Sequence, residues 1–169
     1  MNGFINILKP PGMTSAAVVA TLRRLTGGEK AGHAGTLDPE AAGVLPVMIG
    51  RAARLFDYLV DKEKEYVAEV AFGTATDTQD ATGRILRRGE NYPTRAQVEA
   101  ALPSLTGDIR QRPSMFSAIK RDGKPLYALA RQGAEIEVPE RTVHVETLTL
   151  LDETPRHGFM LRIHCGRGT

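Results

Sequence analysis

The sequence has no tryptophan, a single cysteine and few aromatic residues, which make up 5% of the chain. One cysteine excludes an internal disulfide and a cysteine-based zinc cluster. Cys165 lies in an alternating apolar stretch, which predicts a packed thiol rather than a reactive one. No apolar run approaches the roughly 18 residues of a membrane-spanning helix, and the N-terminus lacks the pattern of a signal peptide. These absences favour a reducing, cytoplasmic setting.

The 169 residues are 41% hydrophobic and 25% charged, which is the composition of a folded globular protein. This length predicts one domain, with room for a small appendage. The net charge is only +2, but basic residues crowd one segment of the chain: Arg110, Arg112, Lys120, Arg121, Lys124 and Arg131. Such clustering of basic residues indicates contacts with the phosphates of a partner. The alternative is a solvent-exposed basic surface without a partner.

The hydrophobic pattern predicts strands alternating irregularly with helices. Strands are expected at residues 4–8, 44–49, 66–72, 143–151 and 159–165, and helices at 15–25, 51–60, 95–102 and 126–131. Asp122-Gly123 is typical of a hairpin turn, and Thr14 or Ser15 is a suitable cap for the first helix. This order predicts an α+β fold with a mixed, largely antiparallel sheet flanked by helices.

A glycine-rich segment, Gly-His-Ala-Gly-Thr-Leu-Asp-Pro at residues 32–39, holds the first candidate site. Asp38, pinned between the loop and a proline, is a candidate reactive acid. The alternative is structural, because aspartate is a preferred helix cap and proline a preferred first helical residue. His33 is a candidate ligand or base, and the alternative is a positioning or packing residue.

Two further candidates lie later in the chain. Tyr66 opens an alternating stretch, where the alternative is a half-buried core residue. Asp77 and Asp80 lie in a segment rich in turn-forming residues. They could bind a cation, but the full calcium-loop pattern is missing, which favours turn capping.

Read in order, the segments resemble the TruB-type pseudouridine synthases, and their bacterial branch in particular. The similarity extends over nearly the whole chain and rests on several ordered blocks. These blocks are Lys9-Pro10-Pro11-Gly12, residues 32–39 continued by Gly43-Val44-Leu45-Pro46 and Gly50, Lys64-Glu65-Tyr66, Thr76-Asp77-Thr78-Gln79-Asp80, residues 113–120, residues 123–127 and residues 130–133.

The resemblance implies an enzyme that converts uridine 55 in the T-loop of tRNA to pseudouridine, with no cofactor and no metal. It implies the pseudouridine synthase fold, tRNA as the partner, no membrane partner and a monomeric state. The uridine must be flipped out of the folded loop before its glycosidic bond is accessible.

The family's pattern also implies roles for individual residues. Asp38 would be the catalytic aspartate, acting in its ionised form, Tyr66 would stack on the flipped base, and Asp80 would join a charge network with the family's arginine. Whether Asp38 attacks the sugar or first helps to remove a ribose proton stays open. The residues expected to contact the substrate are His33, Gly35, Thr36, Lys120, Lys124 and Arg131.

The family continues after Thr169 with a Tyr-Ile-Arg segment that supplies a second tyrosine and the partner arginine. Residues 1–169 are therefore expected to be the N-terminal part of the catalytic domain. Two alternatives are an RNA-binding piece without catalysis and an unrelated carboxylate-dependent hydrolase. The hydrolase needs a second carboxylate placed for acid–base work, and only Asp80 is a candidate for it.

Overall fold

The chain folds into two units, Met1–Lys62 and Glu63–Thr169, in a computed structural model. The structure describes all residues except 60–62, 118, 122–123, 127–129, 131–136 and 156. All strand pairs in the described part of the chain are antiparallel, as the alternating patterns predicted.

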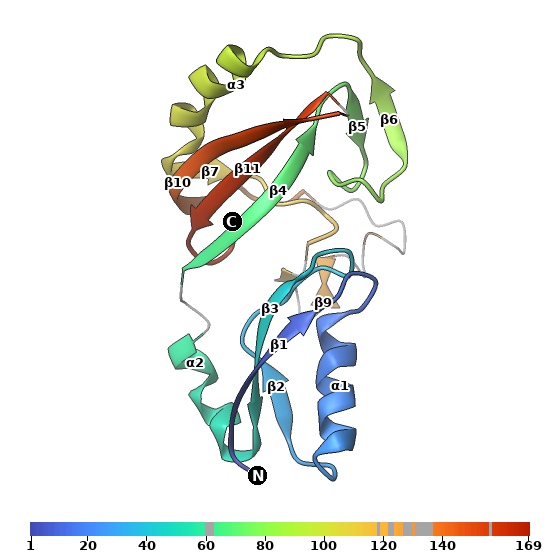
Figure 1. Ribbon diagram of the computed structural model, residues 1–169, viewed down its shortest axis with the longest axis vertical. Coiled ribbons are helices and arrows are strands. Elements are labelled where there is room, and N and C mark those ends of the chain that lie inside the picture. Colours follow the sequence, from blue (N-terminus) through green and yellow to red (C-terminus); the bar gives the residue numbers. More distant parts are fainter. Residues whose placement is uncertain (60–62, 118, 122–123, 127–129, 131–136, 156) are drawn as a thin grey trace. The chain divides into compact units, whose positions relative to one another are not determined.

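The first unit contains a three-stranded sheet in the order β1-β3-β2, which Figure 1 shows beside helix α1. The strands are β1 (Gly3–Lys9), β2 (Ala31–His33) and β3 (Gly43–Ile49). Leu45 and Val47 of the central strand face α1, whereas Met48 points to the opposite face and packs on Ala52. Strand β3 is therefore buried on both faces, as its continuous apolar run predicted.

Helix α1 spans Ser15–Leu25 and confirms the predicted helix. Thr14 is its cap, because the Thr14 hydroxyl accepts a hydrogen bond from the Ala17 N–H at 3.1 Å. The helix predicted at residues 51–60 is only partly confirmed. It starts as a 3₁₀ helix (Gly50–Leu55), in which Ala52 is buried, and continues as the short α2 (Phe56–Leu59), so the pattern predicted a helical segment but not its tighter winding.

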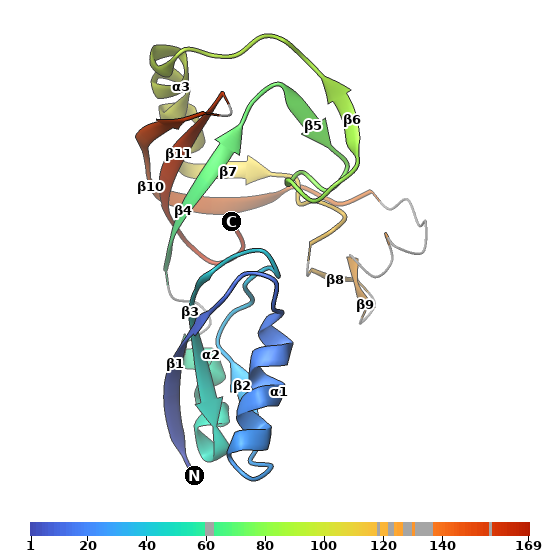
Figure 2. The same cartoon turned by 45° about the vertical axis from the view of Figure 1, so that its right-hand side comes forward.

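The second unit is built on a four-stranded sheet in the order β4-β11-β10-β7. These strands are β4 (Lys64–Ala71), β7 (Gly107–Gln111), β10 (Arg141–Thr154) and β11 (Gly158–Cys165). Helix α3 (Arg95–Ala101), followed by the 3₁₀ helix η2 (Leu102–Leu105), lies against this sheet (Figures 1 and 2). Val98 of α3 packs with Leu150, Phe159 and Leu161 to form its core. Cys165 is buried, which confirms the packed thiol.

Two short ribbons complete the second unit. Strands β5 (Thr74–Thr76) and β6 (Ile85–Arg88) form one, which extends from the end of β4 in both views, and β8 (Lys120–Arg121) and β9 (Lys124–Pro125) form the other. The sequence patterns did not predict β2, β5, β6 or β7. The expected turn at residues 122–123 and most of the helix expected at 126–131 lie outside the described residues. Among the helices that are described, none is both long and apolar enough to cross a membrane.

On the polar face of the second unit, His144 lies between two carboxylates. Its Nδ1 is 2.6 Å from Asp108 Oδ1, and its Nε2 is 3.1 Å from Glu146 Oε2. The hydrogen bond with Asp108, followed by that with Glu146, raises the pKa of His144 above its ordinary value of 6.5. Because folding raises the pKa of His144, the contacts of its protonated ring with Asp108 and Glu146 stabilise the folded unit. This stabilisation is complete at pH values below 6.5. This contribution is lost as the pH rises through the folded-state pKa.

We expect Asp108→Asn to lower the pKa of His144, because the largest cause of its elevation is removed. An NMR titration of the His144 ring in the two proteins measures this change. Asp152→Asn is the matched control. Asp152 lies on β10, the strand of His144, but its carboxylate accepts a hydrogen bond from the Glu153 N–H and not from the His144 ring. A His144 titration that Asp108→Asn leaves unchanged would contradict the assignment.

Candidate active site

The loop that carries Asp38 is a turn and not the start of a helix. The Ala41 N–H donates to the Asp38 carbonyl at 3.1 Å and closes a four-residue turn through Pro39 and Glu40. The interpretation of Asp38 as a helix cap is therefore wrong. A type I turn prefers aspartate first and proline second, so the same dipeptide suits both structures. The Asp38 side chain is exposed, as a carboxylate that meets a substrate must be.

The backbone after Asp38 is held by a buried lysine. Lys9 is 0% exposed, and its Nζ donates to the carbonyls of Pro10 at 2.9 Å, Met13 at 2.6 Å and Pro39 at 3.0 Å. The Gly12 N–H donates to the same Pro39 carbonyl at 2.8 Å. An ammonium has three N–H donors, and each of them finds a carbonyl here. The turn after β1 and the Asp38 loop are thereby tied together.

The backbone before Asp38 is held by the first turn of α1. The Ser15 hydroxyl accepts from the Leu37 N–H at 2.9 Å and donates to the Leu37 carbonyl at 3.0 Å. The Leu37 side chain packs against the cluster of Val18, Leu45 and Val47. Two residues earlier, Gly35 has a φ of 142°, a conformation that other residues rarely adopt. The loop therefore turns at a glycine and is fixed from Leu37 onward.

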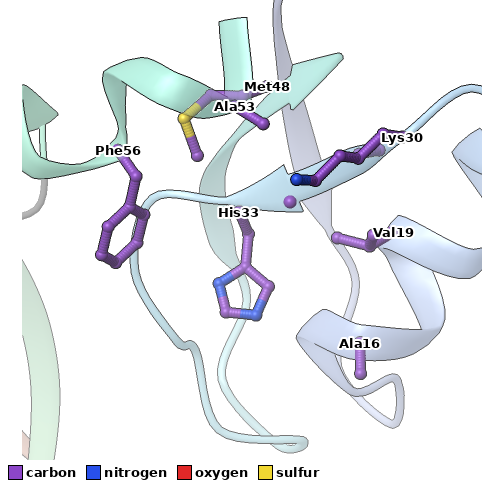
Figure 3. A pocket seen from close by; sticks show the side chains of 9 residues that line it. Ala16, Val19, Lys30, His33, Met48, Ala53 and Phe56 are labelled. Carbon is purple, nitrogen blue, oxygen red and sulfur yellow. The ribbon is translucent and has the colours of Figure 1, made fainter. Parts of the chain in front are cut away.

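His33 ends strand β2 and lines an open hollow of about 480 Å³ in the first unit. Figure 3 shows its ring in the wall of the hollow, with Phe56 on one side and Ala16 and Val19 of α1 on the other. Its Nδ1 is buried and has no hydrogen-bond partner among the described residues. The hollow is mainly apolar, and Lys30 is the charged residue in its lining. His33, Gly35, Thr36 and Asp38 thus follow one another in a single segment of the first unit, and Thr36 is exposed.

Tyr66 lies on β4, an edge strand of the sheet of the second unit, and pairs with Ile163 of β11. The Tyr66 side chain is 36% exposed, so this residue is not part of the buried core. Asp80 belongs to the same unit and lies between β5 and β6. The structure therefore places Tyr66 and Asp80 in the second unit, whereas Asp38 belongs to the first.

The carboxylate of Asp80 is engaged inside its own loop. Its Oδ1 accepts from the Thr78 hydroxyl at 2.7 Å, the Thr82 hydroxyl at 2.7 Å and the Thr82 N–H at 2.8 Å. The bond from the Thr82 hydroxyl is the main cause that holds the pKa of Asp80 below its ordinary value of 3.8, against the opposing effect of burial. Asp77 Oδ1 accepts from the Arg84 N–H at 2.8 Å. Both carboxylates cap turns, which confirms the turn-capping interpretation.

The loop of Asp80 also requires a glycine. A Cβ added at Gly83 would lie 2.2 Å from the Thr78 hydroxyl oxygen and 2.6 Å from Asp77 Oδ1. Only a residue without a side chain lets the turn-capping groups close around this position. In the described part of the chain, no group of three or more histidine, cysteine, aspartate or glutamate residues is arranged to hold a metal ion.

The basic residues of the crowded segment have different surroundings. Arg110 on β7 and Arg112, which directly follows that strand, both pair with Glu140, at 3.1 Å and 3.4 Å, so part of their charge is balanced within the protein. Lys120 lies on β8 and Lys124 on β9, in the second ribbon. Arg131 lies outside the described residues.

From the sequence, Ser15 was considered only as an alternative cap of α1, a position that Thr14 holds instead, and Lys9 was given no role, although the pattern contained the signal. Alternation along β1 puts Lys9 on the same face as Ile5 and Ile7. The helical period puts Ser15 on the same face of α1 as Val18. A polar residue at a core position needs a polar partner, and the nearby loop provides it.

Comparison with known proteins identifies relatives over the whole chain. Residues 23–169 match the family described as TruB family pseudouridylate synthase (N terminal domain). A tRNA pseudouridine synthase B from Symbiobacterium thermophilum is 49% identical over 172 residues, which cover 100% of this chain and 58% of that protein. The corresponding protein from Carboxydothermus hydrogenoformans is 47% identical over 174 residues, covering 100% and 60%. The chain thus spans less than two thirds of these relatives.

Solved structures give the same picture for the fold. A chain in the crystal structure of a Cbf5-Nop10-Gar1 complex matches with a TM-score of 0.70 and 32% identity, over 99% of this chain and 40% of that one. A chain in an H/ACA RNP bound to a substrate RNA containing 2'-deoxyuridine matches with a TM-score of 0.68 and 27% identity, over 99% and 38%.

We expect Lys9→Met to lower the free energy of unfolding by about 3 kcal/mol, because three carbonyls lose a charged donor. Urea denaturation followed by circular dichroism measures the change. Lys30→Met is the matched control, since Lys30 is exposed in the same unit. Equal stability of the two variants would mean that the carbonyls around Lys9 do not depend on its ammonium.

We expect Thr82→Val to raise the pKa of Asp80, because the hydroxyl that lowers it most is removed. Folding lowers this pKa, so the contacts stabilise the second unit above pH 3.8 and are lost as the pH falls through the folded-state pKa. The variant should therefore begin to lose stability at a higher pH during acidification. A carboxyl NMR titration measures the pKa directly.

Thr76→Val is the matched control for this titration. The Thr76 hydroxyl donates to the backbone carbonyl of Asp80 at 2.7 Å and not to its carboxylate. Equal pKa changes in the two variants would show that the loop conformation, rather than the Thr82 bond, sets the acidity of Asp80.

Proposed function

Because the chain belongs to the TruB family of pseudouridylate synthases, we propose that the protein isomerises uridine 55 in the T-loop of tRNA to pseudouridine. The predicted α+β pseudouridine synthase fold is confirmed by the likeness to the Cbf5 structures. The observation that carries the proposal is Asp38, an exposed carboxylate on a loop whose backbone is tied on both sides. The names of the relatives, tRNA pseudouridine synthase B, support tRNA as the substrate.

The proposed reaction is an isomerisation, so it changes the bond between the base and the ribose but not the atomic composition of the nucleotide. The bond between N1 and the ribose C1′ breaks, the base rotates, and C5 forms a new bond to C1′. The proton on C5 leaves to water, and N1 takes up a proton. No electrons are gained or lost, so the isomerisation requires no redox cofactor. Asp38 would act in its ionised form, either as a nucleophile at the sugar or as the group that assists proton removal.

The family's pattern implies roles for the remaining site residues. Tyr66, exposed on an edge strand, would stack on the flipped uridine and could move a proton. His33 would occupy the space that the base leaves. Gly35 and Thr36 would face the RNA from the same loop. Lys120, Lys124 and Arg131 would contact phosphates, which position an RNA without reading its sequence.

Asp80 would take part in a charge network at the site. The T-stem-loop as the recognised part of tRNA, a monomeric enzyme and a cytoplasmic location complete the proposal. Residues 1–169 would then be the N-terminal part of the catalytic domain.

We expect Asp38→Asn to reduce the reaction to below about one thousandth of the wild-type rate, because the amide cannot replace an ionised carboxylate at the reacting sugar. The measurement is tritium release from tRNA labelled at uridine C5, with the full-length protein encoded by the gene. Glu40→Gln is the matched control, because it neutralises another exposed carboxylate two residues away.

Binding of the T-stem-loop should remain within about threefold of wild type in the Asp38 variant, since phosphate contacts dominate RNA affinity. Undiminished tritium release from Asp38→Asn would remove Asp38 from its role. A wild-type protein that binds the RNA but releases no tritium would instead support an RNA-binding protein without catalysis.

A further inference from the structure

The Ser15 hydroxyl satisfies both backbone groups of Leu37, the residue immediately before Asp38. It accepts from the N–H at 2.9 Å and donates to the carbonyl at 3.0 Å. Ser15 is 3% exposed, so water does not compete for these bonds. A single side chain therefore fixes Leu37 in two directions.

The Leu37 carbonyl has a direct geometric consequence for Asp38. A peptide unit is planar, so this carbonyl, the Asp38 nitrogen and the Asp38 Cα lie in one plane. The bond from Ser15 therefore fixes the plane on one side of the Asp38 Cα. On the other side, the Asp38 carbonyl accepts from the Ala41 N–H at 3.1 Å, which fixes the second plane. Together the two planes set the direction in which the Asp38 side chain leaves the backbone.

Ser15 has no second task that would explain these bonds. The helix cap is Thr14, whose hydroxyl accepts from the Ala17 N–H at 3.1 Å. Ser15 instead lies on the buried side of α1 with Val18, and the hydrogen bonds of its hydroxyl in the described part of the chain both go to Leu37. A hydroxyl at this position is useful only to the loop that it contacts.

We propose that Ser15 is a positioning residue for Asp38, which holds the carboxylate in its reactive direction through the peptide plane of Leu37. This inference rests on the proposed function, because it gives that reaction a further residue. Ser15 touches neither the RNA nor the reacting atoms. It acts on the rate of the chemical step and not on the affinity for RNA.

The test compares Ser15→Ala and Thr14→Ala in the full-length protein. Both variants remove one hydroxyl from the start of the same helix, but only the Ser15 hydroxyl forms hydrogen bonds with the Asp38 loop, whereas the Thr14 hydroxyl caps the helix. Tritium release gives kcat and KM, and thermal unfolding by circular dichroism gives the folded fraction at the assay temperature. We expect Ser15→Ala to lower kcat about 10- to 100-fold with KM within about threefold, because small misplacements of a reacting group are costly.

Thr14→Ala should keep kcat within about threefold of wild type, even where it lowers the melting temperature as much as Ser15→Ala does. Ser15→Cys is the second variant, because it preserves the volume while a thiol is a weak donor and acceptor. We expect its kcat to lie between those of wild type and Ser15→Ala. If Ser15→Ala does not fold, the kcat of Ser15→Cys still tests the positioning role.

Hydrogen exchange at the Leu37 amide provides an independent readout. Protection should fall in Ser15→Ala and persist in Thr14→Ala, since only the first change removes the acceptor of this N–H. A Ser15 variant with wild-type kcat, or a Thr14 variant with the same loss, would overturn the positioning role. A wild-type protein without any tritium release would overturn the proposed function itself, and the positioning role with it.

Discussion

The first unit depends on a charge that water does not reach. Removing an ammonium from water is costly unless other dipoles replace the lost hydration. For Lys9 these dipoles are the carbonyls of Pro10, Met13 and Pro39, one for each N–H bond. Their arrangement requires the turn after β1, the start of α1 and the Asp38 loop to lie together. The electrostatic requirement of one side chain thus connects segments that are far apart in the sequence.

The two aspartates of the proposed site are held in opposite ways. Asp80 gives its carboxylate oxygen to three donors of its own loop, so the side chain itself is fixed. Asp38 keeps an exposed side chain, and the bonds that hold its loop go to the backbone on either side. A carboxylate that must meet a substrate cannot have its oxygens occupied by structural bonds. Backbone anchoring gives Asp38 a fixed direction and leaves its oxygens accessible.

Strong periodicity made much of the fold predictable from the sequence. The strands β1, β4, β10 and β11 and the helix α1 were found because their apolar residues recur with a clear period, and β3 was found because its apolar run is continuous. Strands β2 and β5 were not, since three residues are too few to show an alternation. The sequence also identified Asp38, but the preference of Asp-Pro for both helix starts and turns left its local structure open. The partners of Lys9 and Ser15 were missed because a periodic pattern shows only that a polar residue stands at a core position. It does not show which loop carbonyls and amides that residue contacts.

The chemistry proposed for this protein explains why such backbone contacts matter. An isomerisation without a redox cofactor must gain its rate from orientation and from electrostatic stabilisation at the sugar. Orientation depends on how little the reacting carboxylate can move, which is set by the peptide planes around Asp38. Ser15 and Lys9 hold the residues before and after Asp38 from a helix and from a strand, the most rigid parts of the unit. Two polar residues at core positions are therefore best understood as supports of the reacting loop, because their polar atoms bind its backbone.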